Sequence, residues 1–164
     1  MTRKQSGSSA ESVPVLKRPG HRSIRVPGSK SLTARMIMLG ALGAGRTTLK
    51  NPLVCDDTNM LAEAMATIGV GVKWTPSKIV LHCIDGKPPH GGKVNLGAGG
   101  TPSRFMIAAG ALAKAPLVVD GNAKMRTRPI GELVTLLQIL GVEFDNDTLP
   151  VTVNGNDFHG GTLD

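Results

Sequence analysis

The sequence has 164 residues, of which 40% are hydrophobic, and a mean hydropathy of +0.01. These values are typical of one ordinary soluble domain and exclude a chain that is disordered throughout. With one Trp, three Phe and no Tyr, the chain cannot build a nucleic-acid platform from many stacked aromatic side chains. Ten Lys and Arg but a single acid lie in residues 1–50, so the net charge of +7 belongs to the N-terminal third.

Residues 1–21 come first, and their Ser, Gly, Lys and Arg content predicts a basic, disordered tail, with nucleic-acid binding as the alternative. No apolar run resembles a signal peptide or reaches the roughly 18 residues that a membrane span requires. Cys55 and Cys83 have neither metal-ligand nor disulfide spacing. We therefore expect a cytoplasmic protein with reduced thiols and no membrane partner.

The next segments predict a unit of the order β-α-β-α-β-β. We expect strands at 22–26, 47–53, 70–75 and 78–83 and helices at 28–45 and 55–69. The same order then recurs, with strands at 93–99, 116–121, 142–147 and 150–155 and helices at 100–115 and 128–141. The sequence thus indicates a mixed α/β (α+β) fold.

Equivalent residues of the two segments lie 72 positions apart, as in Gly28 with Gly100 and Gly69 with Gly141. A duplicated unit explains why every kind of element recurs in order at one spacing. We place the units at about 22–87 and 90–158. The His-Gly-Gly that opens the second unit recurs at residue 159, which predicts the start of a third unit and indicates that the chain is a fragment.

The helix expected at 28–45 begins with residues suited to an anion. The first N–H groups of a helix lack internal partners and carry a partial positive charge. Lys30 adds an ammonium, Ser29 and Ser31 add hydroxyls, and Arg35 lies about one turn further on. A phosphate or carboxylate is the simplest ligand, although the serines are also common helix caps.

Two later segments also place residues suited to binding an anion at the start of an expected helix. Before the helix expected at 100–115, the glycine-rich approach is followed by Thr101, Ser103 and Arg104. The segment 124–128 contains Lys124, Arg126 and Arg128 just before a helix whose first residue we expect to be Pro129. Cations at a helix start oppose its dipole, so a shared anion would explain them; solvated loop charges are the alternative.

The remaining polar residues suggest less chemistry. Asp56 and Asp57 fit caps of the second expected helix better than a carboxylate pair for acid–base work. The four histidines lack ligand spacing, so we expect no metal site.

Taken together, PGSKSLTAR, LKNPLVCDDTNML, LGAGGTPSRF and DGNAKMRTRPIGELVTLL resemble the EPSP synthase family, 3-phosphoshikimate 1-carboxyvinyltransferases of the shikimate pathway. The resemblance implies a transferase that moves the enolpyruvyl group of phosphoenolpyruvate to the 5-hydroxyl of shikimate 3-phosphate, releases phosphate and needs no cofactor. It implies two lobes of three β-α-β-α-β-β units each. Residues 22–164 would then be an incomplete N-terminal lobe, with two complete units and the start of a third.

The resemblance also implies roles for single residues. Lys30, Ser31 and Arg35 stand where the family binds shikimate 3-phosphate. For phosphoenolpyruvate, whose place the herbicide glyphosate also takes, the implied residues are Lys30, Gly100, Thr101, Arg104 and Lys124. Arg128 and Asp57 would support the site.

Three positions depart from the family pattern. Ala98 stands where an asparagine is usual, Lys124 where an arginine is usual, and Phe105 where a proline is frequent. Lysine keeps the charge but loses the planar fork that grips a carboxylate or phosphate. We expect altered phosphoenolpyruvate affinity and an altered response to glyphosate.

The general acid–base groups of the family lie in the other lobe, so the resemblance implies no catalytic residue here. We expect this chain to be inactive unless it is paired with the missing C-terminal half. Nucleic acid is not an expected partner. The alternatives are a UDP-sugar enolpyruvyl transferase and a non-catalytic module that binds anions or nucleic acid; steep salt dependence of DNA binding would mark the last.

Overall fold

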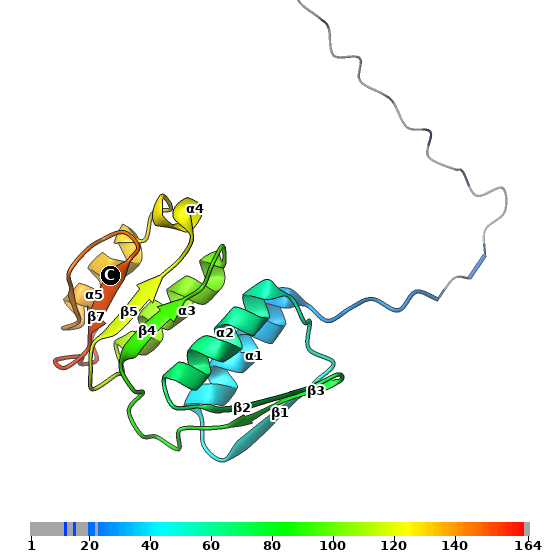
Figure 1. The fold of residues 1–164 in the computed structure, drawn as a ribbon, viewed down its shortest axis with the longest axis horizontal. Coiled ribbons are helices and arrows are strands. Elements are labelled where there is room, and N and C mark those ends of the chain that lie inside the picture. The colour runs from blue at the N-terminus through cyan, green and yellow to red at the C-terminus, as the bar shows by residue number, and fades with distance from the viewer. Residues whose placement is uncertain (1–11, 13–14, 16–19, 22, 163–164) are drawn as a thin grey trace, which may run out of the picture.

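The computed structural model of the chain describes residues 12, 15, 20–21 and 23–162 (Figure 1). The tail predicted at 1–21 therefore lies almost entirely outside the described residues. The helices are α1 (Lys30–Leu42), α2 (Asp56–Thr67), α3 (Gly100–Gly110), α4 (Ala123–Arg126) and α5 (Gly131–Ile139). The strands are β1 (Arg46–Lys50), β2 (Gly71–Thr75), β3 (Lys78–His82), β4 (Gly92–Asn95), β5 (Leu117–Asp120), β6 (Glu143–Phe144) and β7 (Val151–Asn154).

The strands form two small sheets with a shared pattern. The first sheet is antiparallel and has the order β1-β3-β2; the second has the order β4-β5-β7-β6. In the second, β4 runs parallel to β5 because α3 connects them as a crossover, and the other pairs are antiparallel. Thus β3 lies between β1 and β2 as β7 lies between β5 and β6, and the second half repeats the arrangement of the first.

The helices α1, α2 and α3 pack against one another between the two sheets (Figure 1). Their buried apolar residues include Ile37, Leu61, Met65, Met106 and Ile107, each 0% exposed. They join buried strand residues in one cluster that spans both halves. Burial of each such side chain contributes about 1.5–3 kcal/mol, so this cluster fixes the helix starts relative to one another.

Glycines end the second helix of each half at equivalent places. Gly69 follows α2 with φ +102, and Gly141 follows α5 with φ +87. Positive φ is strained for residues that carry a Cβ, which is why glycine stands at both helix ends.

The strand expected at 22–26 is wrong for the described residues 23–26, which form no strand. Ile24 is 81% exposed and Val26 is 76% exposed, so nothing packs on either side chain. An alternating pattern yields a strand only where a partner supplies hydrogen bonds, and β1 has a single neighbour, β3, among the described strands. Likewise, residues 159–162 of the expected third unit form no strand.

The helix expected to begin at Pro129 begins at Gly131, and the unpredicted short helix α4 precedes it. The residue before a proline disfavours helical backbone, so Arg128 and Pro129 separate α4 from α5. Across the described part of the chain, none of the helices has both the length and the apolar character that a membrane crossing requires.

Candidate functional site

The start of α1 offers unpaired backbone N–H groups beside an ammonium. Ser29 is the N-cap, and its hydroxyl accepts a hydrogen bond from Leu32 N–H at 3.4 Å. Lys30 is the first residue of the helix, and Lys30 and Ser31 are both exposed. No acid of α1 lies in this first turn, so the helix itself does not offset the positive field of its start.

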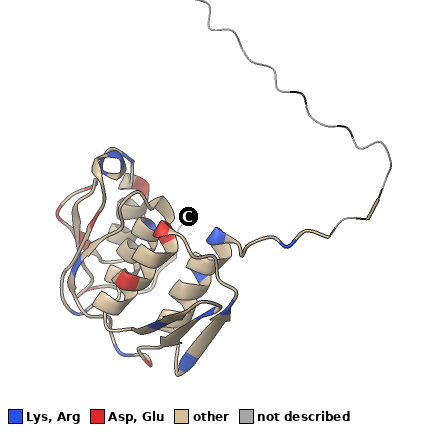
Figure 2. Ribbon diagram, turned by 45° about the vertical axis from the view of Figure 1, so that its right-hand side comes forward, with Lys and Arg blue, Asp and Glu red and all other residues tan. Residues whose placement is uncertain are grey.

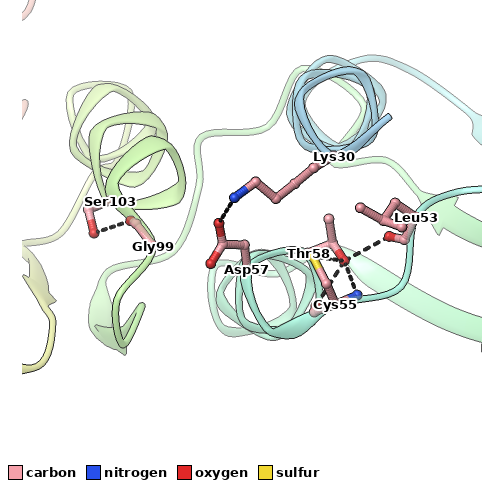
Figure 3. Close-up of polar contacts among 7 residues, drawn as sticks. All are labelled: Lys30, Leu53, Cys55, Asp57, Thr58, Gly99 and Ser103. Atoms are coloured by element: carbon pink, nitrogen blue, oxygen red, sulfur yellow. Dashed lines mark hydrogen bonds and ion pairs between the residues drawn. The ribbon is translucent and has the colours of Figure 1, made fainter. Parts of the chain in front are cut away.

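Lys30 does not point freely into solvent. Its ammonium forms an ion pair with Asp57 Oδ2 at 2.9 Å, which joins the start of α1 to the start of α2 (Figure 3). The hydrogen bond that Lys30 donates to Asp57, together with the negative charge of Asp57, raises the pKa of Lys30 above its ordinary value. Lys30 therefore stays positively charged across the physiological range. A bound anion would meet an ammonium that is already held in place.

The start of α2 is capped differently from the expectation. Its N-cap is Cys55, whose N–H donates to the Thr58 hydroxyl at 3.0 Å, while that hydroxyl donates to Leu53 O at 2.9 Å (Figure 3). Asp56 and Asp57 occupy the first turn rather than the cap position. Asp57 is thereby left available for Lys30.

Arg35 lies one turn further along α1. Its Nη1 donates to Ser31 O at 3.1 Å, so the guanidinium folds back toward the helix start. The structure thus brings together Lys30, Ser31, Arg35 and Asp57, four of the residues predicted for the site.

The start of α3 is glycine-rich and lies in the same close-up as Lys30 and Asp57 (Figure 3). Its N-cap is Gly99, which has no side chain to occupy the first N–H groups. Thr101 is exposed, as a ligand-binding hydroxyl must be. Ser103, which we expected to offer a second hydroxyl, is 0% exposed and donates to Gly99 O at 2.8 Å, so that expectation is wrong.

Two guanidinium groups converge on Gly100. Arg104 Nη1 donates to Gly100 O at 3.2 Å, and its Nη2 donates to Pro129 O at 2.8 Å. Arg128 Nη1 lies 2.9 Å from the place that a Cβ on Gly100 would take. Two cations at one helix start repel each other. An anion between them would relieve this repulsion, and the glycine cap leaves the N–H groups of the helix start open to such an anion.

Lys124 is exposed on the α4 turn, between β5 and Arg128. Figure 2 shows Lys and Arg both at the start of α1 and along this turn. Of the residues that depart from the family pattern, Ala98 is exposed, and Phe105 is half-buried and packs against the core.

Arg126, the third cation of the segment 124–128, forms an ion pair with Asp120. Its Nε donates to Asp120 Oδ1 at 3.0 Å and its Nη2 to Asp120 Oδ2 at 2.8 Å. Sequence reasoning missed this pair, because Asp120 stands in a strand and no short motif joins it to Arg126. The hydrogen bonds from Arg126 lower the pKa of Asp120 below its ordinary value of 3.8, against the burial that raises it.

The Asp120 carboxylate gives a pH prediction. Because its pKa is lowered by folding, its stabilising effect is complete above pH 3.8 and is lost as the pH falls through the lowered value. Asp120→Asn should cost about 1–2 kcal/mol of unfolding free energy at pH 7, discounted because the Arg126 side chain is 51% exposed. Urea unfolding at pH 7 and at about pH 2.5 measures this; an equal cost at both pH values would contradict it.

Two clefts border the site without coinciding with Gly100, and both are smaller than the cleft of about 700 Å³ beside Gly28. One of about 460 Å³ lies between α1 and β1, where Ser29 forms one end and Leu32 and Met36 form an apolar wall. Another of about 330 Å³ lies between Arg104 and α5. Lys30, Arg35, Lys124 and Arg128 are exposed on the surface rather than enclosed in a cavity.

Comparisons with known proteins identify the family of the chain. The family model of EPSP synthase (3-phosphoshikimate 1-carboxyvinyltransferase) matches residues 19–164. A 3-phosphoshikimate 1-carboxyvinyltransferase of Syntrophobacter fumaroxidans is 36% identical over 150 residues, which are 85% of this chain and 34% of that protein. One of Mycobacterium ulcerans is 37% identical over 157 residues, 92% of this chain and 36% of that protein.

Solved structures give the same result. The structure of EPSP synthase from Acinetobacter baumannii superposes with a TM-score of 0.72 at 26% identity, over 80% of this chain and 31% of that one. The enolpyruvyl transferase NikO from Streptomyces tendae shares the fold with a TM-score of 0.57 at 17% identity, over 77% of this chain and 29% of that one. The chain spans about a third of the length of the curated relatives it matches.

Proposed function

Because the chain belongs to the EPSP synthase family, we propose that it supplies the N-terminal, substrate-binding part of an enolpyruvyl transferase. The reaction would move the enolpyruvyl group of phosphoenolpyruvate to the 5-hydroxyl of shikimate 3-phosphate and release phosphate. The observation that carries the proposal is the approach of Arg104 and Arg128 to Gly100, at the open start of α3.

The proposed roles follow the two clusters of cations. Lys30, Ser31 and Arg35 at the start of α1 would bind shikimate 3-phosphate, and Asp57 would hold Lys30 in place. Gly100, Thr101, Arg104, Lys124 and Lys30 are the residues proposed to bind phosphoenolpyruvate, with Arg128 in support. Both substrates are anions, so a surface lined by fixed cations would concentrate them and offset their mutual repulsion.

The chemical step also needs a group that takes the hydroxyl proton and protonates the enol methylene. Asp57 is engaged by Lys30 and Asp120 by Arg126, which makes both poor candidates. We assign this role to the part of the enzyme beyond the matched third.

Both cysteines are free thiols, which supports a cytosolic location.

Exposed apolar residues support such a larger assembly. On α5, Leu136 is 43% exposed and Ile139 is 58% exposed. The equivalent helix α2 is covered by α3 and β4, and Ala64, the counterpart of Leu136, is 3% exposed. On α1, Leu32 and Leu39 are 64% and 66% exposed. Further chain of the same enzyme is the proposed cover for these faces.

Binding by the chain itself tests the proposal. Titration with shikimate 3-phosphate and then phosphoenolpyruvate, followed by amide chemical shifts, should perturb the N–H groups at the starts of α1 and α3. A duplex DNA titration at two salt concentrations is the control. Strong, salt-dependent DNA binding without a response to either substrate would reject the enzyme and favour a nucleic-acid-binding module.

Gly100→Ala gives a sharper prediction for the phosphoenolpyruvate side. The new Cβ would lie 2.9 Å from Arg128 Nη1 and 3.6 Å from Arg104 Nη1, so it should displace Arg128. The fold should tolerate the change, because the neighbours are ends of flexible side chains. We expect phosphoenolpyruvate KM to rise about tenfold in the assembled enzyme, with unchanged thermal stability.

The matched control is Gly131→Ala at the first residue of α5, where a Cβ meets nothing within 4 Å. That variant should keep the wild-type KM. An equal rise of KM in both variants would argue against a role for Gly100 in binding.

A further inference from the structure

The carboxylate of Asp120 lies where β5 passes into the loop that carries Lys124 and Arg128. The residue is 4% exposed. Oδ1 accepts from Gly121 N–H at 2.7 Å, in addition to the two bonds from the Arg126 guanidinium. The buried carboxylate is therefore paired with Arg126, so this cation does not bind the shared anion that the sequence suggested for Lys124, Arg126 and Arg128.

The short helix α4 is attached to the fold at three points. Asn122 N–H donates to Gly97 O at 2.8 Å, in the loop that leads into α3. Met125 is 0% exposed and fills the core. The Asp120–Arg126 ion pair is the third attachment, and it fixes the half-exposed side chain of Arg126. Because four residues are too few for a stable helix, these attachments determine where α4 lies.

The position of α4 in turn determines where two cations lie. Lys124 and Arg128 stand two residues before and two residues after Arg126. Arg128 N–H donates to Met125 O at 3.0 Å, so the backbone of Arg128 follows α4. Since Arg128 Nη1 reaches the space beside Gly100, a displacement of α4 would move this guanidinium away from the start of α3.

We propose that Asp120 and Arg126 are a positioning pair for the anion site. The pair fixes α4 so that Arg128 and Lys124 keep their places near Gly100, and it holds the third cation, Arg126, away from the ligand. This inference rests on the proposed function, because it assigns the pair to the phosphoenolpyruvate side of the site.

The two clusters of cations make the effect selective. Lys30 is held by Asp57 on α2, and neither residue contacts α4 through the hydrogen bonds of the described chain. Loss of the Asp120–Arg126 pair should therefore weaken phosphoenolpyruvate binding and leave shikimate 3-phosphate binding unchanged. A purely stabilising pair would instead lower the fraction of folded enzyme, and hence the apparent kcat, without changing either KM.

Steady-state kinetics distinguish a positioning pair from a purely stabilising pair. The enzyme measured is this chain assembled with the C-terminal remainder of a relative. For Asp120→Asn we expect phosphoenolpyruvate KM to rise about 10- to 100-fold, while shikimate 3-phosphate KM stays within about twofold. Arg126→Lys keeps the charge but not the two-pronged contact, so its KM should lie between wild type and Asp120→Asn. The double variant D120N/R126Q should add little to D120N, because both changes remove one contact.

Asp145→Asn is the matched control. Asp145 also accepts a backbone hydrogen bond, from Thr152 N–H at 2.7 Å, but it lies on the β6–β7 side of the second sheet. Its substitution should reduce stability and leave both KM values unchanged. An unchanged phosphoenolpyruvate KM for D120N in an active enzyme would overturn the proposal.

Amide hydrogen exchange of the chain alone separates failure of this inference from failure of the proposed function. In Asp120→Asn, exchange of the N–H groups of Met125 and Arg128 should accelerate at least about tenfold more than that of Leu61 in α2, whose change reports the loss of overall stability. If exchange at Met125 and Arg128 is faster in the variant but the wild-type assembly shows no turnover, the proposed function is rejected. The inference that the pair holds α4 in place would still stand. Unchanged exchange at Met125 and Arg128 would overturn the inference itself.

Discussion

Replacing Lys30 with methionine should lower kcat/KM of the assembled enzyme by about 10² to 10³-fold. The ammonium is the first cation of α1, and its ion pair with Asp57 holds it at the proposed meeting point of both substrates. Methionine keeps the length and removes the charge, so the variant should fold. Steady-state kinetics with each substrate varied in turn measure the loss.

Lys78→Met, at an exposed lysine of β3, is the control and should retain wild-type kinetics. The kcat/KM of Asp57→Asn should lie between those of Lys30→Met and Lys78→Met. In this variant the Lys30 ammonium remains, but the residue that pairs with it is no longer charged. A folded Lys30→Met enzyme with more than about a third of the wild-type kcat/KM would exclude Lys30 from the proposed role.

Gly28→Ala should disturb the backbone more than Gly100→Ala does. A Cβ at this position would lie 2.6 Å from Asn51 O and 2.9 Å from Leu53 N, and both of these atoms belong to the backbone. The loop before α1 and the loop before α2 would have to separate, which should cost about 1–3 kcal/mol of unfolding free energy. Because these loops lead to Lys30 and Asp57, shikimate 3-phosphate binding should weaken as well.

Chemical unfolding and substrate titration of the same sample measure both effects. Gly160→Ala, where a Cβ meets nothing within 4 Å, should change neither. A Gly28→Ala chain with wild-type stability would show that the two loops can separate without cost, against the account of how α1 and α2 are held together.

The elements with strong local signals could be predicted from the sequence. The helices α1, α2 and α3 overlap the segments expected for them, although Cys55 and not an aspartate caps α2, and the strands β2, β3 and β7 lie within their expected segments. The EPSP synthase resemblance and the mixed α/β fold are confirmed by the family model and by the solved structures. The residue roles and the division into units remain predictions.

The features that could not be predicted depend on partners distant in the sequence or on fine geometry. Residues 23–26 alternate as a strand but have no neighbouring strand to pair with. Ser103 has the sequence position of a ligand hydroxyl, yet packing turns it inward to Gly99 O. The Asp120–Arg126 pair depends on how β5 and α4 meet, and no local pattern encodes that meeting.

The contacts at the start of α1 give a reason for a lysine between two serines before an apolar helix. Ser29 caps α1, Asp57 keeps the ammonium of Lys30 in place, and in the proposed function this ammonium and the first N–H groups of the helix bind an anion. Lysine at position 124, where the family usually has arginine, keeps a charge near Gly100 without a planar fork. Altered phosphoenolpyruvate affinity thus remains the expectation for this chain.

Phosphate release from shikimate 3-phosphate and phosphoenolpyruvate tests the central claim most directly. The assay compares this chain alone, a separately made C-terminal remainder of a relative alone, and their mixture. The account predicts release only in the mixture, because the cations of this chain and the proton-transfer groups of the remainder must meet in one site. Release by this chain alone, or none in a mixture of folded partners, would contradict it.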